Sequence, residues 1–301
     1  MTYDPPAASS GLLTVERSRV SRPVTMRSFH SHAAREIYWL MSGERYYFII
    51  DRVFRVAKGD IVLIDSNTIH RTVNAGTSAG YERVLVMFSD DLIRGVPFVG
   101  ERDLADVFKP GFRIVRPEPI IRTRLEQLLL HLHEEQTRRR SGHEIISVSI
   151  LIELLALLRR AVPEGARVHE EHPSPLHARV SHIARYLGEN HDADVSLDRL
   201  AVRFGTSKYH LCRTFKEASG STILEYLNAV RVGEAKRLLL ESSDPVSAVA
   251  SAAGFSGTAH LDRVFGRVLG CTPLEYRRRH IDPTATDPTA TTGMRTDGRA
   301  P

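Results

Sequence analysis

The strongest constraint on this chain is a sequence pattern that occurs twice in its last third, about fifty residues apart. Each copy has a small-residue pair, a glycine turn, a Leu-x-x-x-Phe spacing, and a second glycine followed by Thr and Glu-Tyr. The first copy comprises Leu200-Ala201, Gly205, Leu211, Phe215, Gly220, Thr222 and Glu225-Tyr226, and the second Val249-Ala250, Gly254, Leu261, Phe265, Gly270, Thr272 and Glu275-Tyr276. A helix, a glycine turn and a second helix with a buried stripe form a helix-turn-helix. The repeat therefore predicts two tandem helix-turn-helix units.

The second helix of each unit has one buried and one exposed side. In the first copy Gly205 permits the turn, Ser207 can cap the next helix, and Leu211 and Phe215 lie four residues apart on the core side. In the second copy Ser256 or Thr258 is the expected cap. Residues 222–241 form an amphipathic pattern that predicts a long helix between the two units.

The exposed sides supply the candidate DNA-binding residues. They are Ser207, Lys208, Tyr209, Cys212, Arg213, Lys216, Thr258, Ala259, Asp262 and Arg263. Arginine can pair with two acceptors of guanine or with a phosphate, so Arg213 and Arg263 are the favoured contacts, with an intradomain salt bridge as the alternative. Asp262 can accept from a cytosine amino group, but a side chain turned to solvent is favoured there.

The pattern resembles the DNA-binding domain of the AraC/XylS family of bacterial transcription regulators. The resemblance covers residues 176–279 and is densest from Ala250-x-x-Ala-Gly254-Phe255-Ser256 to Thr272-Pro273-x-Glu275-Tyr276-Arg277. It implies a ligand-responsive regulator whose two recognition helices enter successive major-groove segments, roughly 34 Å apart, on double-stranded DNA.

The first third has a different pattern, with short apolar or alternating runs at residues 37–41, 46–50, 53–56, 61–64 and 81–88. Strands of this length and spacing predict an antiparallel barrel or sandwich. Within them lie His30-x-His32-x3-Glu36-x6-Gly43 and Gly59-x5-Asp65-x-Asn67-x2-His70. This resembles the two motifs of the cupin barrel, with Asp65 and Asn67 where that pattern prefers Pro and Gly. The sensor domains of many AraC-type regulators are similar to this barrel.

Residues of even number share one face of a continuous strand, which predicts an interior polar pocket. The candidate effector-binding residues are His30, His32, Glu36, Tyr38 and His70. Imidazole and carboxylate also suit a divalent metal at His30, His32, Glu36 and His70, but effector contact is favoured and no cofactor is expected. A purely structural role of these residues is the remaining alternative. Buried polar groups need partners, so a sugar or an organic acid is the expected ligand class.

Residues 117–138 and 143–160 have leucine stripes at helical spacing. The resemblance to AraC-type regulators implies that one helix packs on the barrel while the other meets a second subunit, and so a homodimer is expected. The fold class is therefore α+β, with a cupin-like barrel, a helical dimerisation segment, and an all-α domain of two helix-turn-helix units joined by a long helix.

Composition and charge agree with this organisation. The chain has 301 residues, 42% of them hydrophobic, and a net charge of +5. The expected boundaries are a flexible arm at 1–11, a sensing and dimerisation domain at 12–162, a linker at 163–175, a DNA-binding domain at 176–280 and a disordered tail at 281–301. No run of about eighteen apolar residues occurs, and Cys212 and Cys271 suit a reducing compartment, so a cytoplasmic protein without a membrane partner is expected.

The sequence predicts a sequence-specific transcription regulator that senses a small molecule in its barrel. It is expected to act as an activator and not as an enzyme. A metal-dependent cupin enzyme fused to a DNA-binding domain is the alternative. RNA polymerase is a candidate further partner.

Overall fold

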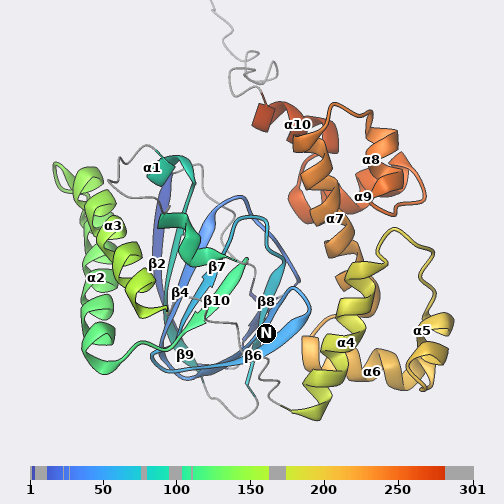
Figure 1. Ribbon diagram of the computed structural model, residues 1–301, viewed down its shortest axis with the longest axis horizontal. Helices are drawn as coiled ribbons and strands as arrows, with labels where there is room; N and C mark the ends of the chain where they lie inside the picture. Colours follow the sequence, from blue (N-terminus) through green and yellow to red (C-terminus); the bar gives the residue numbers. More distant parts are fainter. Residues whose placement is uncertain are drawn as a thin grey trace, which may run out of the picture. The chain divides into compact units, whose positions relative to one another are not determined.

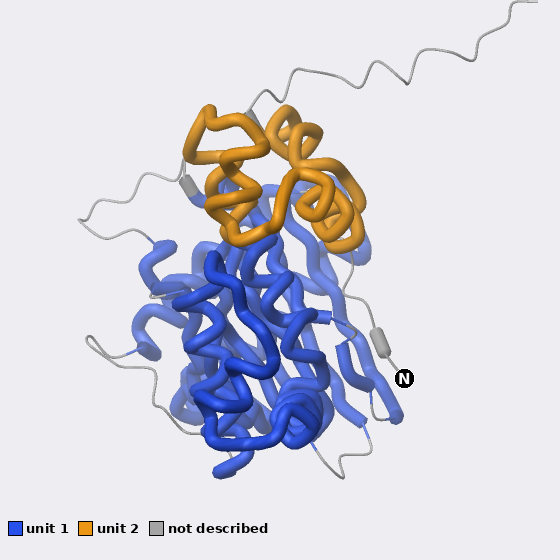
Figure 2. The backbone as a smooth tube through the Cα atoms, turned by 90° about the vertical axis from the view of Figure 1, so that its right-hand side faces the viewer, with its two compact units in different colours: residues 1–233 blue, residues 234–301 orange. Residues whose placement is uncertain are grey.

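A computed structural model describes residues 2–3, 12–22, 24–26, 28–75, 80–94, 104–109, 111–162 and 174–281. The expected arm, linker and tail lie outside these residues, apart from Thr2, Tyr3, Ser174, Pro175 and Ile281. The backbone forms two compact units, residues 1–233 and 234–301, which Figure 2 shows in different colours. The first unit contains the strands and the first helix-turn-helix, and the second contains the other helix-turn-helix.

The strands belong to three sheets. They are β1 (Thr2–Tyr3), β2 (Leu13–Val20), β3 (Thr25–Met26), β4 (Arg35–Ser42), β5 (Glu44–Ile49), β6 (Arg52–Ala57), β7 (Ile61–Ile64), β8 (His70–Asn74), β9 (Tyr81–Phe88) and β10 (Phe112–Val115). One sheet has the order β10-β7-β4-β9-β2, a second has β6-β5-β8, and every pair in both is antiparallel. β1 and β3 pair in parallel.

Alternation along the strands builds separate apolar clusters on the two faces of each sheet. Tyr38 and Leu40 of β4 meet Tyr47 and Ile49 of β5 in the interior between the two larger sheets. Intervening residues such as Ile37 face the helices on the outside of the five-stranded sheet. Because the strands are covered on both faces, their sequences read as nearly continuous apolar runs.

The predicted strand runs are confirmed, with small shifts at their ends. The structure adds β1, β2, β3, β8 and β10, which were not predicted from the sequence. β2 reads LTVERSRV and lies at the edge of the sheet, where its polar residues are half-buried or exposed, and these residues weaken its apolar signal.

Helices α2 (Pro119–Arg138) and α3 (His143–Ala161) pack side by side against the five-stranded sheet, and Figure 1 shows them in green. Leu125 and Leu132 of α2 share one buried cluster with Leu151 and Leu158 of α3. The expectation that only one helix would pack on the barrel is therefore wrong, because both leucine stripes are needed to cover this face. Two short helices, α1 (Asp91–Arg94) and η1 (Leu104–Phe108), precede β10 and these two helices in the sequence.

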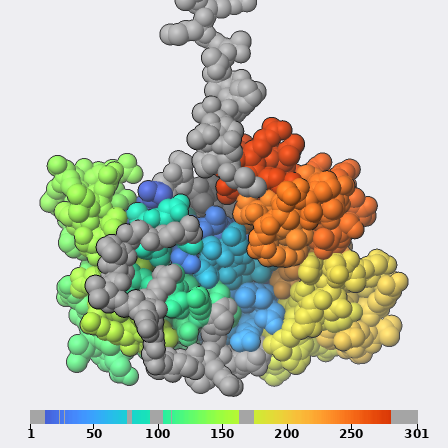
Figure 3. Space-filling view, turned by 45° about the horizontal axis from the view of Figure 1, so that its top comes forward, coloured from blue at the N-terminus to red at the C-terminus, as the bar shows by residue number. Residues whose placement is uncertain are grey.

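The remaining helices form the predicted tandem repeat. They are α4 (Pro175–Glu189), α5 (Leu197–Arg203), α6 (Lys208–Ser219), α7 (Ile223–Glu241), α8 (Val246–Ala252), α9 (Thr258–Leu269) and α10 (Pro273–Ile281). α7 is the predicted long helix, and the division between the two units falls within it. Figure 3 shows the packed side chains of α8–α10 in orange and red.

The caps of the two recognition helices differ. The Ser207 hydroxyl accepts a hydrogen bond from the His210 amide, which confirms the predicted cap of α6. α9 instead follows Gly257, with no capping side chain. The prediction of a Ser256 or Thr258 cap is wrong because glycine, at φ 153°, occupies the capping position itself.

Among the described residues, no helix combines the length and the apolar character needed to cross a lipid bilayer.

Candidate functional sites

Two of the predicted pocket histidines are neighbours through their backbones. His30, in the segment before β4, and His70, at the start of β8, form an isolated antiparallel bridge with N–O distances of 3.2 and 3.0 Å. Their ring centroids lie 4.2 Å apart, and the ring of His32 lies 5.2 Å from that of His70. Each of the three histidines has one ring nitrogen, of the kind that could bind a metal, within 4.8 Å of the corresponding nitrogens of the other two.

Glu36 of β4 is the centre of this cluster. Its side chain is buried, and its Oε2 lies 3.1 Å from His32 Nε2 and 3.4 Å from His70 Nε2. The hydroxyl of Tyr47, from β5, donates a 2.9 Å hydrogen bond to Oε1. Both carboxylate oxygens are thus held by neighbours from three segments of the barrel.

The backbone fixes which nitrogen of each ring carries hydrogen. His32 Nδ1 lies 2.8 Å from the Ala34 carbonyl and His70 Nδ1 lies 2.9 Å from the Thr68 carbonyl. A carbonyl oxygen only accepts, so each Nδ1 donates and, in a neutral ring, Nε2 has only its lone pair. Two such lone pairs and a carboxylate oxygen facing one another repel unless a proton or a cation lies between them.

Charge and burial act in opposite directions on the acid at the centre. Burial alone would raise the pKa of Glu36, but His70 and His32 hold it well below the usual value, so the group is a carboxylate at neutral pH. Burial, together with the nearby His70 and His32, lowers the pKa of His30 well below its usual value.

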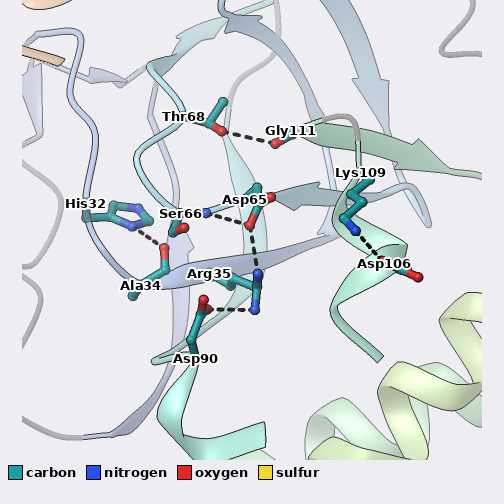
Figure 4. Close-up of polar contacts among 10 residues, drawn as sticks. All are labelled: His32, Ala34, Arg35, Asp65, Ser66, Thr68, Asp90, Asp106, Lys109 and Gly111. Atoms are coloured by element: carbon teal, nitrogen blue, oxygen red, sulfur yellow. Dashed lines mark hydrogen bonds and ion pairs between the residues drawn. The ribbon is translucent and has the colours of Figure 1, made fainter. Parts of the chain in front are cut away.

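The two departures from the cupin motif have structural roles at the edge of the cluster. Asp65 accepts a hydrogen bond from the Ser66 amide and pairs with Arg35 at 2.8 Å, while Arg35 also pairs with Asp90 at 2.6 Å (Figure 4). Asn67 has a positive φ of 59°, which asparagine tolerates better than most residues, and its amide donates to the His32 carbonyl. These residues therefore maintain the turn and hold the segment that carries His32.

Tyr38 lies two residues beyond Glu36 on the same interior face, as predicted. The parity argument holds along β4, where Glu36, Tyr38 and Leu40 are all buried. It is wrong for His30 and His32, because the chain is not a continuous strand between them and β4, which begins at Arg35. Those two rings reach the cluster from a loop and a bridge instead.

Sequence reasoning missed the polar residues that the other strands add to this interior. Tyr47 binds Glu36 directly, and its ring lies 5.1 Å from that of Tyr38. Arg45 of β5 and Arg83 of β9 are also buried. The odd-number alternation of Arg45, Tyr47 and Ile49 was the available signal, but the apolar residues between them obscure it.

Residues next to the paired histidines lie on the opposite side of the barrel wall, against the first helix-turn-helix. The Phe29 ring centroid lies 5.0 Å from that of Tyr226 in α7, which in turn lies 5.6 Å from that of Phe215 in α6. Arg71 follows His70, and a Cβ added to Gly220 at the end of α6 would lie 3.1 Å from its Nη2 atom. The Tyr226 hydroxyl also donates to the Ile50 carbonyl at 2.9 Å.

The first recognition helix, α6, presents the predicted exposed side. Leu211 and Phe215 are buried, whereas Tyr209 has an exposed fraction of 77% and Arg213 is exposed. Cys212 is half-buried against the apolar cluster, so its expected place on the open side is wrong. The other predicted residues of this helix, Ser207, Lys208 and Lys216, are exposed, and Lys208 pairs with Asp198 at 2.7 Å.

The second recognition helix, α9, repeats the arrangement. Leu261 and Phe265 are buried, and Thr258, Ala259, Asp262 and Arg263 are exposed, as predicted. Within the described part of the chain, neither Arg213 nor Arg263 forms a salt bridge. The alternative of an intradomain ion pair is therefore not supported.

Comparison with known proteins agrees with both halves of this description. A helix-turn-helix domain family matches residues 200–279, and a cupin domain family matches residues 21–84. The HTH-type transcriptional activator RhaR of Mannheimia succiniciproducens is 22% identical over 269 residues, covering 89% of this chain and 92% of the relative. The multiple antibiotic resistance protein MarA of Escherichia coli K12 is 30% identical over 99 residues, covering 33% of this chain and 78% of MarA.

A solved structure of the DNA-binding domain of AdpA, in complex with a target DNA, is 31% identical to this chain. The match covers 37% of this chain and 98% of that domain, with a TM-score of 0.33.

A cupin-like barrel followed by two helix-turn-helix units defines a DNA-binding transcription regulator with an attached sensor domain. The chain belongs to the AraC/XylS family.

Proposed function

We propose that this regulator senses a small molecule at the cluster of His30, His32, Glu36, Tyr38 and His70. The observation that carries the proposal is a buried carboxylate surrounded by rings in the interior of the barrel. The buried Nδ1 of His30 and the buried hydroxyl of Tyr38 have no hydrogen-bond partner, and a bound ligand would provide one. We call the two helix-turn-helix units, residues 197–219 and 246–269, the readers. Ligand binding would shift the population between arrangements of the readers that can bind DNA and arrangements that cannot.

We further propose that Arg213 and Arg263 contact DNA, with Lys208, Tyr209 and Thr258 beside them and Lys216 on a phosphate. Exposure of both guanidinium groups at corresponding places on α6 and α9 supports this assignment. A base contact by either arginine contributes about 1–3 kcal/mol at one base pair, whereas a phosphate contact strengthens binding to all sequences equally.

The test compares Arg213→Ala and Arg263→Ala on duplexes recovered with the purified protein and on scrambled duplexes. A base-reading arginine should lose about ten- to hundredfold affinity for the recovered duplex and little for the scrambled one. Arg55→Ala, an exposed arginine of β6, is the control. Unchanged affinity in both reader variants would contradict the assignment.

The effector assignment is tested by calorimetric titration of candidate sugars and organic acids into the native chain, Glu36→Ala and His32→Ala. The variants should lose ligand binding and induction while keeping affinity for DNA in the absence of ligand. If both variants retain ligand binding and induction, the ligand binds elsewhere.

A divalent metal ion is a second candidate occupant of the same cluster. The Nε2 atoms of His32 and His70 face one carboxylate oxygen, and their Nδ1 atoms donate to backbone carbonyls, as histidine ligands of metals usually do. His30, His32, His70 and Glu36 would hold the ion, which would act as a Lewis acid toward a ligand oxygen.

Elemental analysis of the purified chain and equilibrium dialysis with Zn²⁺ test this candidate. One equivalent should be retained by the native chain and by His182→Ala, which changes an exposed histidine of α4, and lost in His32→Ala. Failure of the native chain to bind Zn²⁺ would exclude the ion. Bound metal together with catalytic turnover would instead favour a metal-dependent cupin enzyme, whereas we propose that the protein is purely a regulator.

We also propose that the protein acts in the cytoplasm as a homodimer, with RNA polymerase as a further partner. The outer sides of α2 and α3 support the dimer, since Ile120 and Ile145 have exposed fractions of 87% and 75%. Sedimentation of the native chain and of an Ile120→Glu, Ile145→Glu variant tests it. A monomeric native chain would contradict the proposal.

A further inference from the structure

A second polar group lies in the barrel interior beyond Tyr47. It consists of Tyr38 of β4, Arg45 of β5 and Arg83 of β9, with exposed fractions of 1%, 1% and 3%. All three alternate with outward-facing neighbours, so their side chains enter the space between the two larger sheets. Two buried guanidinium groups in one small interior are unusual and require compensation.

Arg45 has neutral partners. Its Nη1 donates to the Val24 carbonyl, its Nη2 donates to Thr72 Oγ1 at 3.1 Å, and its guanidinium lies 4.3 Å from the centre of the Tyr81 ring. Its Nε atom is buried without a hydrogen-bond partner. In the described part of the chain no carboxylate forms an ion pair with Arg45, so its charge is solvated by dipoles and an aromatic face alone.

Arg83 has both a neutral and a charged partner. Its Nε donates to the Ser18 hydroxyl at 3.0 Å, and its Nη2 lies 3.4 Å from Glu16, whose side chain is 37% exposed. The other nearby acid, Glu36, has its two oxygens engaged by Tyr47, His32 and His70. Among the described residues, Glu16 therefore pairs with Arg83, whereas no carboxylate is left to pair with Arg45.

Tyr38 stands between these groups with a free hydroxyl. The guanidinium of Arg83 lies 5.6 Å from the centre of its ring, and its buried oxygen has no hydrogen-bond partner. Burial raises the pKa of Tyr38 to about 12, although Arg83 and Arg45 act against the rise. The hydroxyl is therefore a neutral donor at pH 7 and does not itself supply a negative charge to Arg45.

We propose that Tyr38, Arg45 and Arg83 bind the carboxylate of a small organic acid. The two guanidinium groups would neutralise the carboxylate, and the Tyr38 hydroxyl would donate a hydrogen bond to it. The apolar part of the acid would contact the interior cluster that includes Leu40, Val56 and Leu85. This inference rests on the proposed function and narrows its ligand class to an anion, because an uncharged sugar would leave the charge of Arg45 uncompensated.

The test measures the thermal midpoint of the full chain with acetate, benzoate or hexanoate, each against its uncharged amide at equal ionic strength. At least one acid should raise the midpoint by about 3 °C or more at tenfold excess over its dissociation constant, and its amide should not. Equal responses to every acid and its amide would overturn the proposal.

Variants separate a binding role from a structural one. Arg45→Met removes an uncompensated buried charge while keeping its bulk, so the midpoint without acid should stay or rise, and the response to acid should disappear. Tyr38→Phe should reduce the affinity for the acid by about tenfold or more. Arg55→Met, on the outside of β6, should behave like the native chain.

An Arg45→Met midpoint that falls without acid, together with an unchanged response to acid, would assign Arg45 to packing and overturn the site. A native chain that binds its recovered duplex but ignores all three acids would refute the carboxylate site and leave the regulator intact. Loss of sequence-specific DNA binding would instead refute the proposed function.

Discussion

The two readers have the same sequence pattern but different structural surroundings. In the first reader Phe215 packs against Phe48 of the barrel, as does Tyr226 of the following helix α7, and this reader belongs to the same compact unit as the barrel. The second forms a compact unit with the end of α7. The repeat therefore specifies the internal packing of a reader, whereas residues outside the repeat determine whether that reader packs against the barrel.

The largest expected contrast comes from truncating the buried phenylalanine of each reader. Phe215→Ala and Phe265→Ala should each destabilise their own reader by about 3–5 kcal/mol, because both side chains are fully buried. Only Phe215→Ala should also shift the unfolding of the barrel, since Phe215 packs against Phe48. The measurement is urea unfolding. Fluorescence of Trp39, the single tryptophan, reports the unfolding of the barrel, and circular dichroism reports the unfolding of the helices.

Equal shifts of the Trp39 transition in the two variants would remove the distinction between the readers. A matched Leu128→Ala change in α2, which is buried against the barrel, should shift the Trp39 signal and serves as the positive control.

A smaller contrast is expected at the starts of the recognition helices. Ser207→Ala should destabilise the first reader by about 1 kcal/mol because it removes the cap of the His210 amide. Ser256→Ala should change the second by less than about 0.5 kcal/mol, since Gly257 begins α9 without a capping side chain. Thermal unfolding of the two variants measures this, and similar losses would mean that Ser256 caps α9 in solution.

The smallest effect should come from the ion pair between α4, the helix that precedes the first reader, and the barrel. Arg185 of α4 donates to Asp51, in the turn between β5 and β6, at 2.7 Å. Arg185→Ala should cost less than about 1 kcal/mol and speed amide exchange in that turn by up to about fivefold. Arg237→Ala, which breaks an exposed pair with Glu234 within α7, should leave that turn unchanged. Unchanged exchange in Arg185→Ala would mean that the ion pair does not hold the turn.

The repeat made the reader helices predictable from sequence, because each has one apolar stripe and glycines at its end. α6 and α9 both end at a glycine with positive φ, Gly220 and Gly270. The capping of α9 was not predictable, since Ser256, Gly257 and Thr258 are all residues found at such positions.

The interior of the barrel was only partly predictable. His30, His32, Glu36 and His70 could be grouped through the cupin motif, but the loop that brings His30 and His32 into place broke the simple alternation. Arg45 and Tyr47 were hidden because β5 is buried on both faces, with Phe48 against the reader and Tyr47 against the interior. A strand covered on both faces has no period of two in its apolar residues, so sequence alone cannot tell its sides apart.

The bridge between His30 and His70 places sensor and reader on opposite sides of a single thickness of backbone. Phe29 and Arg71, one position away from those histidines, lie against Tyr226 and Gly220. A chimaera that joins this barrel to the reader of a relative should therefore require Phe29 and Arg71 to be exchanged together with α6 and α7. Evolution toward a new ligand at His30 or His70 faces the same restriction. A backbone shift that suits the ligand also moves Phe29 and Arg71, the side chains that contact Tyr226 and Gly220.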